Sequence, residues 1–160
     1  MKLLFSLLAL ILINKECENK NSSSESNKTE IVNSDKSNDQ QKEYTIEYSA
    51  ISRGIFKEIT INNSSITVKK DRNTNPVTKK CSNEIWSKLT HILDEVDLKM
   101  LPELEAPTQK RLYDGAAHAT LKVIVDGETY TTSSFDHGFP PEEIKDLCDK
   151  LIEISVDTKE

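Results

Sequence analysis

The stretch 119–135, ATLKVIVDGETYTTSSF, decides the fold. Its apolar residues from Ala119 to Val125 alternate with polar ones, which is the pattern of a half-buried strand. Asp126-Gly127 follows, and a second run continues from 128 to 135. Asp-Gly between two such runs is a strong hairpin signal, because the tight turn needs positive φ at its two central residues. The sequence therefore predicts an antiparallel hairpin with strands near 118–125 and 128–135.

Three more strands are predicted before this hairpin, near 44–51, 55–62 and 65–70. In the first, Tyr44, Ile46 and Tyr48 share one face, and the intervening polar residues share the other. The second and third runs meet at Asn62-Asn63-Ser64. Asparagine tolerates positive φ, so this junction favours a tight hairpin.

Two amphipathic helices are predicted near 83–96 and 141–154. In both segments the apolar residues recur at helical spacing on one face. Ser82 is a good N-cap for the first helix. Pro140-Pro141, followed by two glutamates, favours the start of the second. Between them, the span 97–113 contains two prolines and predicts a short turn under the sheet rather than a long helix.

Together these elements predict an α+β domain: a five-stranded, mainly antiparallel sheet with both helices on one face. The two halves follow a similar order of hairpin, loop and amphipathic helix, which suggests a ββα repeat. From its length, the part after residue 44 is one domain. We therefore divide the chain into a signal peptide (1–16), a polar tether (17–43) and a single domain (44–156).

The N-terminal segment predicts export. Met1-Lys2 carries a positive charge, and an almost unbroken apolar run follows from Leu3 to Ile13. This run suits the core of a signal peptide and is shorter than the roughly 20 residues of a membrane-spanning helix. With Cys17 close behind, the segment resembles a bacterial lipoprotein leader. In such a leader the cysteine is lipidated and becomes the first residue of the mature chain.

The three residues before Cys17 differ from a typical lipoprotein box. They are Asn14-Lys15-Glu16, whereas the box has small or aliphatic residues at these positions. Three alternatives to lipidation therefore stay open. The chain could be exported without a lipid, held by an uncleaved leader, or cytosolic with an apolar N-terminus.

The segment 18–43 is polar and predicts a disordered tether. It has four lysines, six acidic residues and eleven serines or asparagines, but no aromatic residue. So little apolar surface cannot offset the conformational entropy lost on ordering. A coil of this length would hold the domain roughly 30 Å from its anchor.

Overall composition excludes several function classes. The chain has 21 basic and 27 acidic residues, which argues against nucleic acid as a partner. It has no glycine-rich phosphate loop and no metalloprotease or hydrolase motif, so no cofactor is indicated.

Besides Cys17 there are Cys81 and Cys148. We expect Cys148 to pack as a small buried hydrophobic residue. Export to an oxidising compartment would also permit a disulfide bond between Cys81 and Cys148.

Two loops hold the candidate site residues. Asp114 lies before the strand 118–125 and His118 begins it, while Asp136 and His137 follow the strand 128–135. Because these strands form an antiparallel hairpin, the two loops should be neighbours. The four side chains could hold a divalent metal ion or act as an acid–base pair. The competing interpretation is structural, with Asp136 accepting hydrogen bonds from N–H groups between residues 137 and 143.

At 114–119 and 135–141 the chain resembles small uncharacterised lipoproteins of Bacteroidetes. The resemblance extends from about Tyr44 to Ile154. It implies an envelope-facing α+β domain and no particular reaction or ligand. The sequence therefore predicts a lipid-anchored, non-enzymatic binding or interaction protein of the cell envelope, facing the periplasm or the cell surface. Its partners would be the membrane, through the N-terminal lipid, and a possible envelope protein. The alternative is a small metal-binding or hydrolytic domain that uses His118, Asp136 and His137.

Overall fold

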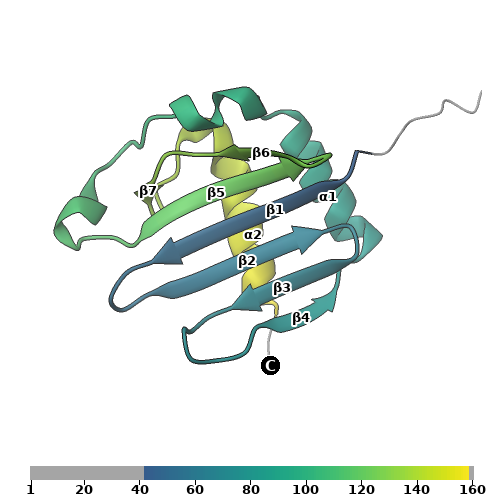
Figure 1. Cartoon of the computed structure of the whole chain (residues 1–160), viewed down its shortest axis with the longest axis horizontal. Coiled ribbons are helices and arrows are strands. Elements are labelled where there is room, and N and C mark those ends of the chain that lie inside the picture. Colours follow the sequence, from purple (N-terminus) through teal and green to yellow (C-terminus); the bar gives the residue numbers. More distant parts are fainter. Residues whose placement is uncertain (1–41, 159–160) are drawn as a thin grey trace, which may run out of the picture. The chain divides into compact units, whose positions relative to one another are not determined.

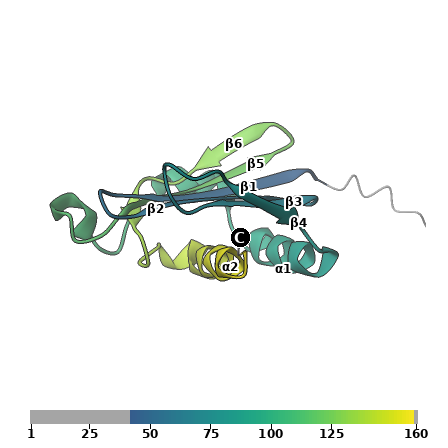
Figure 2. The same cartoon turned by 90° about the horizontal axis from the view of Figure 1, so that it is seen from below.

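The computed structural model describes residues 42–158. The predicted signal peptide, Cys17 and nearly all of the predicted tether lie outside the described residues. The described part consists of an antiparallel sheet with two helices packed on one of its faces (Figure 1, Figure 2). The predicted α+β class is therefore confirmed.

Within residues 42–158 the sheet has seven strands, in the order β4-β3-β2-β1-β5-β6, with the short β7 also paired to β5. All pairs are antiparallel. The strands are β1 (Tyr44–Ile51), β2 (Phe56–Asn62), β3 (Ser65–Lys69), β4 (Val77–Lys80), β5 (His118–Val125), β6 (Glu128–Thr131) and β7 (Phe135–Asp136). The central strand β1 joins the two halves of the chain, because it pairs with β2 on one side and with β5 on the other.

The sheet has two strands more than the sequence predicted. The first addition is β4, which has only four residues, VTKK, and is too short to show an alternating pattern. The second arises because the predicted strand 128–135 is divided into β6 and β7. Buried Thr132 lies at this break, where its N–H donates to Leu121 O (3.0 Å) and its Oγ1 accepts from Leu121 N–H (3.1 Å). These bonds replace regular pairing at the break.

Both predicted hairpins are confirmed. Asp126 and Gly127 have φ of 50° and 87°, as the turn between β5 and β6 requires. The turn between β2 and β3 does not use the positive φ expected at its asparagines. Instead, Asn62 Oδ1 accepts hydrogen bonds from the N–H groups of Ser64 (2.9 Å) and Ser65 (2.8 Å). The asparagine therefore closes this turn through its side chain.

The two α-helices lie close to their predicted positions. α1 spans Asn83–Asp94, and its N-cap Ser82 accepts a hydrogen bond from Ile85 N–H (3.2 Å). α2 spans Lys145–Val156 and is preceded by the 3-10 turn η3 (Glu142–Ile144). Figure 2 shows both helices on the same face of the sheet. None of the helices within the described residues has the length and apolarity needed to cross a membrane.

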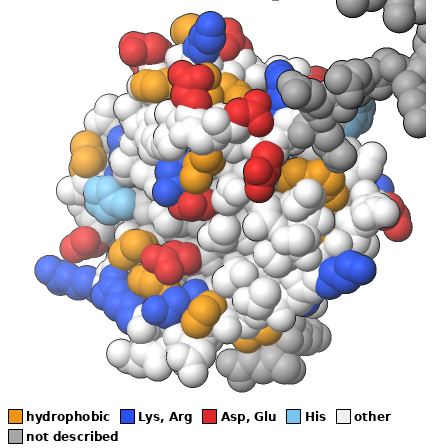
Figure 3. Space-filling view, turned by 45° about the vertical axis from the view of Figure 1, so that its right-hand side comes forward, with side chains coloured by type: hydrophobic (Ala, Val, Ile, Leu, Met, Phe, Trp, Pro, Cys, Tyr) orange, Lys and Arg blue, Asp and Glu red, His pale blue; other side chains and the backbone are white. Residues whose placement is uncertain are grey.

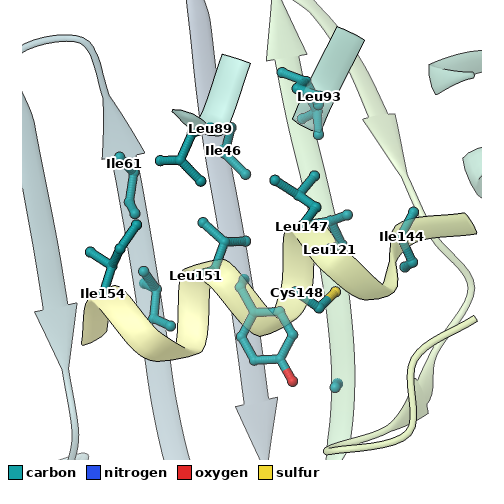
Figure 4. Packing of buried hydrophobic residues seen from close by; sticks show 14 of the residues in the cluster. Ile46, Ile61, Leu89, Leu93, Leu121, Ile144, Leu147, Cys148, Leu151 and Ile154 are labelled. Carbon is teal, nitrogen blue, oxygen red and sulfur yellow. The ribbon is translucent and has the colours of Figure 1, made fainter. Parts of the chain in front are cut away.

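The core lies between the helices and the sheet (Figure 4). Leu89 and Leu93 project from α1, while Leu147, Leu151 and Ile154 project from α2; they meet Ile46, Ile61 and Leu121 from the strands. Cys81 and Cys148 are both buried and free. Burial raises the pKa of the Cys148 thiol to about 12, so this cysteine packs as a neutral hydrophobe.

The connection from α1 to β5 contains two 3-10 helices. η1 (Leu98–Glu103) packs against β6 and buries Leu101, while η2 (Lys110–Tyr113) lies next to β7. Pro102 is inside η1, and no long helix passes through it, as expected.

The strands have two ends, which carry different loops and which we call proximal and distal. The proximal end is the one where the described chain begins, beside the turn at 126–127. The distal end carries the loops 52–55, 70–76, 104–117 and 137–141. In Figure 1 the strand β1 runs from the proximal to the distal end.

Candidate functional site

The predicted proximity of the two candidate loops is confirmed. His118 at the start of β5 is the backbone partner of Asp136 in β7, and Ala119 is the partner of Phe135. The loop before β5 and the loop after β7 therefore meet at the distal end.

The four candidate side chains nevertheless point in different directions. Phe135 and His137 both lie against Tyr48, with ring centroids 6.3 and 6.0 Å away, whereas Asp136 between them turns toward residues 108–111. Such alternation is the rule along an extended chain. His118 is exposed and lies 3.3 Å from Ser134 Oγ through its Nδ1. Asp114 is also exposed, in the left-handed conformation with φ of 60°.

Asp136 is the most tightly bound of the four. Its side chain is 0% exposed, yet the carboxylate accepts four hydrogen bonds. They come from Thr108 Oγ1 (2.5 Å), Lys110 N–H (2.6 Å), Arg111 N–H (3.0 Å) and Arg111 Nη1 (3.1 Å). Burial alone would raise the pKa of Asp136, but these hydrogen bonds outweigh it and hold the pKa well below its usual range. Asp136 is therefore a buried, ionised carboxylate.

The hydrogen-bond donors predicted for the Asp136 carboxylate were wrong. The prediction was N–H groups between residues 137 and 143, but the carboxylate accepts from the loop 108–111, more than 20 residues earlier in the chain. In the turn after β7, it is the backbone O of Asp136 that accepts from Phe139 N–H (2.8 Å). Because that turn is closed by the backbone, the carboxylate is free to organise a different segment.

His137 is half-buried and forms a pair with the buried Tyr48 on the helix-covered side. Its Nδ1 lies 2.7 Å from the hydroxyl of Tyr48. Burial, and then the positive charge of Lys57, lower the pKa of His137 below its usual value. Burial, followed by a smaller contribution from the negative charge of the nearby Asp149, raises the pKa of Tyr48. Both side chains therefore favour their neutral forms, in which a tyrosine hydroxyl donates well to an imidazole nitrogen.

This geometry does not support a metal or acid–base site. Within residues 42–158, no group of three or more His, Cys, Asp and Glu side chains is arranged to hold a metal ion. The oxygens of Asp136 are occupied by the loop 108–111, and His137 is paired with Tyr48. Asp136, His137 and His118 therefore have separate surroundings.

The loop that Asp136 fixes exposes two large apolar side chains. Leu112 is 66% exposed and Tyr113 is 72% exposed. The loop closes through a hydrogen bond from Gly115 N–H to Lys110 O (2.8 Å). At Gly115 a Cβ would lie 3.0 Å from Tyr113 Cε2 and 3.1 Å from Lys110 O, so a larger residue would push Tyr113 aside.

Phe139 extends this exposed surface. Its ring is 44% exposed, and Lys110 Nζ lies 3.8 Å from the ring centroid. We call Leu112, Tyr113 and Phe139 the loop patch. Exposed apolar side chains on a rigidly held loop are typical of contact surfaces. Sequence reasoning did not select the patch, because single apolar residues in a loop carry no pattern.

Two surface hollows lie away from the loop patch. One, of about 480 Å³, is on the uncovered face of the sheet; Glu47 and Lys122 line it and form an ion pair at 2.6 Å. The other, of about 290 Å³, lies at the proximal end beside Leu93 and Tyr130. In the first hollow Glu47 and Lys122 neutralise each other, and Glu58 leaves the lining polar with an excess of negative charge.

Comparisons of the chain with protein-family models, curated proteins and solved structures found no match, so the functional argument rests on the residues described above.

Proposed function

We propose that this chain is an envelope-anchored, non-enzymatic binding protein that contacts its partner through the loop patch. Cys17 would carry the lipid that holds the chain in the membrane, and the tether would connect it to the domain. A tethered domain stays at high effective concentration near the anchoring surface, which favours capture of a partner there.

The observation that carries this proposal is the buried Asp136 beneath two exposed apolar residues. A buried ion pair is costly to desolvate and is weak evidence for a gain in stability. Here the carboxylate fixes the loop 108–111, and the following residues Leu112 and Tyr113 point into solvent. Fixing a loop before it binds lowers the entropy lost on binding. The arrangement therefore suits recognition better than catalysis.

The anchor can be tested on the mature protein from its native host. We expect mass spectrometry of its N-terminal peptide to identify an acylated cysteine at position 17. A Cys17→Ser variant should lose the acyl mass and leave the membrane fraction. A mature chain that begins at Met1 would contradict the proposed anchor.

The contact surface can be tested by photo-crosslinking in the same host. A photoreactive phenylalanine analogue at position 112 should form adducts with an envelope component. Met100 offers a matched control, because it is also apolar and is 49% exposed, but lies on η1 beside β6. We expect at least about tenfold fewer adducts from position 100, as interface energies are concentrated in few residues. Equal yields at the two positions, or no adduct at 112, would overturn the loop patch as the contact surface.

A further inference from the structure

We propose that the distal end of the domain docks on an anionic phospholipid bilayer. This inference rests on the proposed function and gives the chemistry of the partner. It follows from three properties of the distal end: where the large exposed apolar side chains lie, which charges surround them, and how far the chain before β1 can reach.

Exposed apolar side chains are concentrated at the distal end. Among residues 42–158, seven large hydrophobic side chains are exposed. Five of them lie on the distal loops or at the strand ends next to them: Ile51, Ile55, Leu112, Tyr113 and Phe139. The other two, Met100 and Val156, lie on η1 and at the end of α2. The distal end therefore carries most of the large exposed hydrophobic side chains of the described domain.

Basic side chains accompany these apolar ones. Lys69 Nζ and Arg72 Cζ lie 5.3 and 5.5 Å from the ring centroid of Phe56, and Arg72 also donates to Ser52 O (2.9 Å). Arg53 is exposed on the adjacent loop. We call Arg53, Lys69 and Arg72 the basic arc. Figure 3 shows Lys and Arg side chains gathered beside hydrophobic ones at its lower left, where the β1–β2 and β3–β4 loops lie in Figure 1.

The basic arc keeps a positive balance against its acidic neighbours. Lys57 and Lys70 add two further charges, and burial, followed by the charge of Lys70, lowers the pKa of Lys57. The acidic residues on the distal loops and strand ends, apart from the paired Asp136, are Glu58, Asp71, Glu105 and Asp114, four negative charges against the five positive ones of the basic arc, Lys57 and Lys70. Each lysine or arginine near an anionic bilayer adds to the attraction. The net attraction is therefore toward a negative surface, although the whole chain has a formal charge of −6.

The shape of the distal end favours a bilayer over a folded protein. Its apolar side chains project from three separate loops, and both hollows described above lie elsewhere. A protein partner would need a surface complementary to each projecting side chain, whereas the interface of a bilayer deforms around them. Aromatic and aliphatic side chains that enter the interface beside basic residues are the usual pattern of peripheral membrane binding.

The chain before β1 is long enough for this contact. The domain is joined to the tether at the proximal end, and the eight residues of β1 span about 27 Å between the two ends. As a coil, the 26 residues from Glu18 to Glu43 would span roughly 30 Å, and a fully extended chain of this length would span at most about 85 Å. The distal end could therefore reach the membrane in which Cys17 is anchored.

The test uses the full chain in vesicles of phosphatidylethanolamine with 30% phosphatidylglycerol, with the photoreactive residue at position 112 or 100. We expect lipid adducts at 112 and at least about tenfold fewer at 100. In vesicles of phosphatidylcholine alone, or in 0.5 M salt, the yield at 112 should fall by a similar factor because the attraction is electrostatic. The double variant Lys69→Glu/Arg72→Glu should do the same. Its matched control is Lys79→Glu/Lys80→Glu, an equal change of charge near the proximal end of β4, which should leave the yield unchanged.

The outcomes separate this inference from the proposed function. Protein adducts at position 112 in the host, without lipid adducts in anionic vesicles, would overturn the bilayer as partner and leave the loop patch as a contact surface. The absence of adducts at 112 in both settings would overturn both. Equal effects of the two charge-reversal pairs would show that net charge, rather than the basic arc, governs binding, and would also overturn the inference.

Discussion

Replacing Asp136 by alanine should lower the free energy of unfolding by about 3–5 kcal/mol. The substitution removes the acceptor of four hydrogen bonds and leaves the half-buried guanidinium of Arg111 without its anionic partner. Such a loss exceeds that of an exposed helix cap, because the charge left behind is desolvated. Urea denaturation followed by circular dichroism would measure the change.

Asp114→Asn is the matched control for this substitution. Asp114 is an exposed carboxylate of the same loop with φ of 60°, a conformation that asparagine tolerates. We expect its free energy of unfolding to change by less than about 0.5 kcal/mol. If Asp136→Ala were as mild as Asp114→Asn, the carboxylate of Asp136 would not be what holds the loop.

The same carboxylate should make stability depend on acid. The folded state holds the pKa of Asp136 below the ordinary value of about 3.9 that an unfolded chain has. Its stabilising contribution is therefore complete above about pH 5 and is lost as the pH falls through the unfolded-state pKa toward the folded-state pKa. Asp136→Asn cannot lose a charge, so its free energy of unfolding should fall less between pH 5 and pH 2.5 than that of the unsubstituted protein.

Leu151→Ala should lower the free energy of unfolding by about 2–5 kcal/mol. Leu151 is 0% exposed and projects from α2 into the core beneath the sheet (Figure 4). Its truncation would leave a cavity that the surrounding strands cannot close, since β1 and β5 are fixed by pairing on both sides. The same denaturation experiment measures this effect.

Val156→Ala on the same helix is the control. Val156 is 57% exposed, so its truncation removes little buried area, and we expect a change below about 0.5 kcal/mol. Similar losses in the two variants would mean that helix propensity, rather than packing against the sheet, determines how α2 contributes to stability.

Patterns that repeat along the chain predicted the fold well. Both kinds of pattern, alternation in β1, β2 and β5 and helical spacing in α1 and α2, indicate an element with one buried face. Each of these elements lies near its predicted position. β4 was missed because four residues are too few to show a period. The break between β6 and β7 was missed because Thr132, a polar residue, occupies a buried position that the pattern treats as exposed.

The candidate site was less predictable, because its contacts join distant parts of the chain. The hairpin correctly placed the loops around Asp114 and Asp136 side by side. It could not show that Asp136 would bind Thr108, Lys110 and Arg111, since no local rule relates residues 25 to 28 positions apart. The opposite orientations of Asp136 and His137 could have been anticipated, because neighbouring residues in an extended chain face opposite sides.

The central position of β1 has a consequence for how the chain folds. β1 and β2 are joined by a short loop, and so are β2 and β3 and then β5 and β6; these hairpins form from local contacts and should form early. The pairing of β1 with β5 instead brings Ile51 next to His118 across 66 intervening residues. Closing so long a loop costs entropy before any contact is gained. The rate-limiting step of folding is therefore expected to be the docking of the second hairpin against β1, and only afterwards can Asp136 reach the loop that it holds.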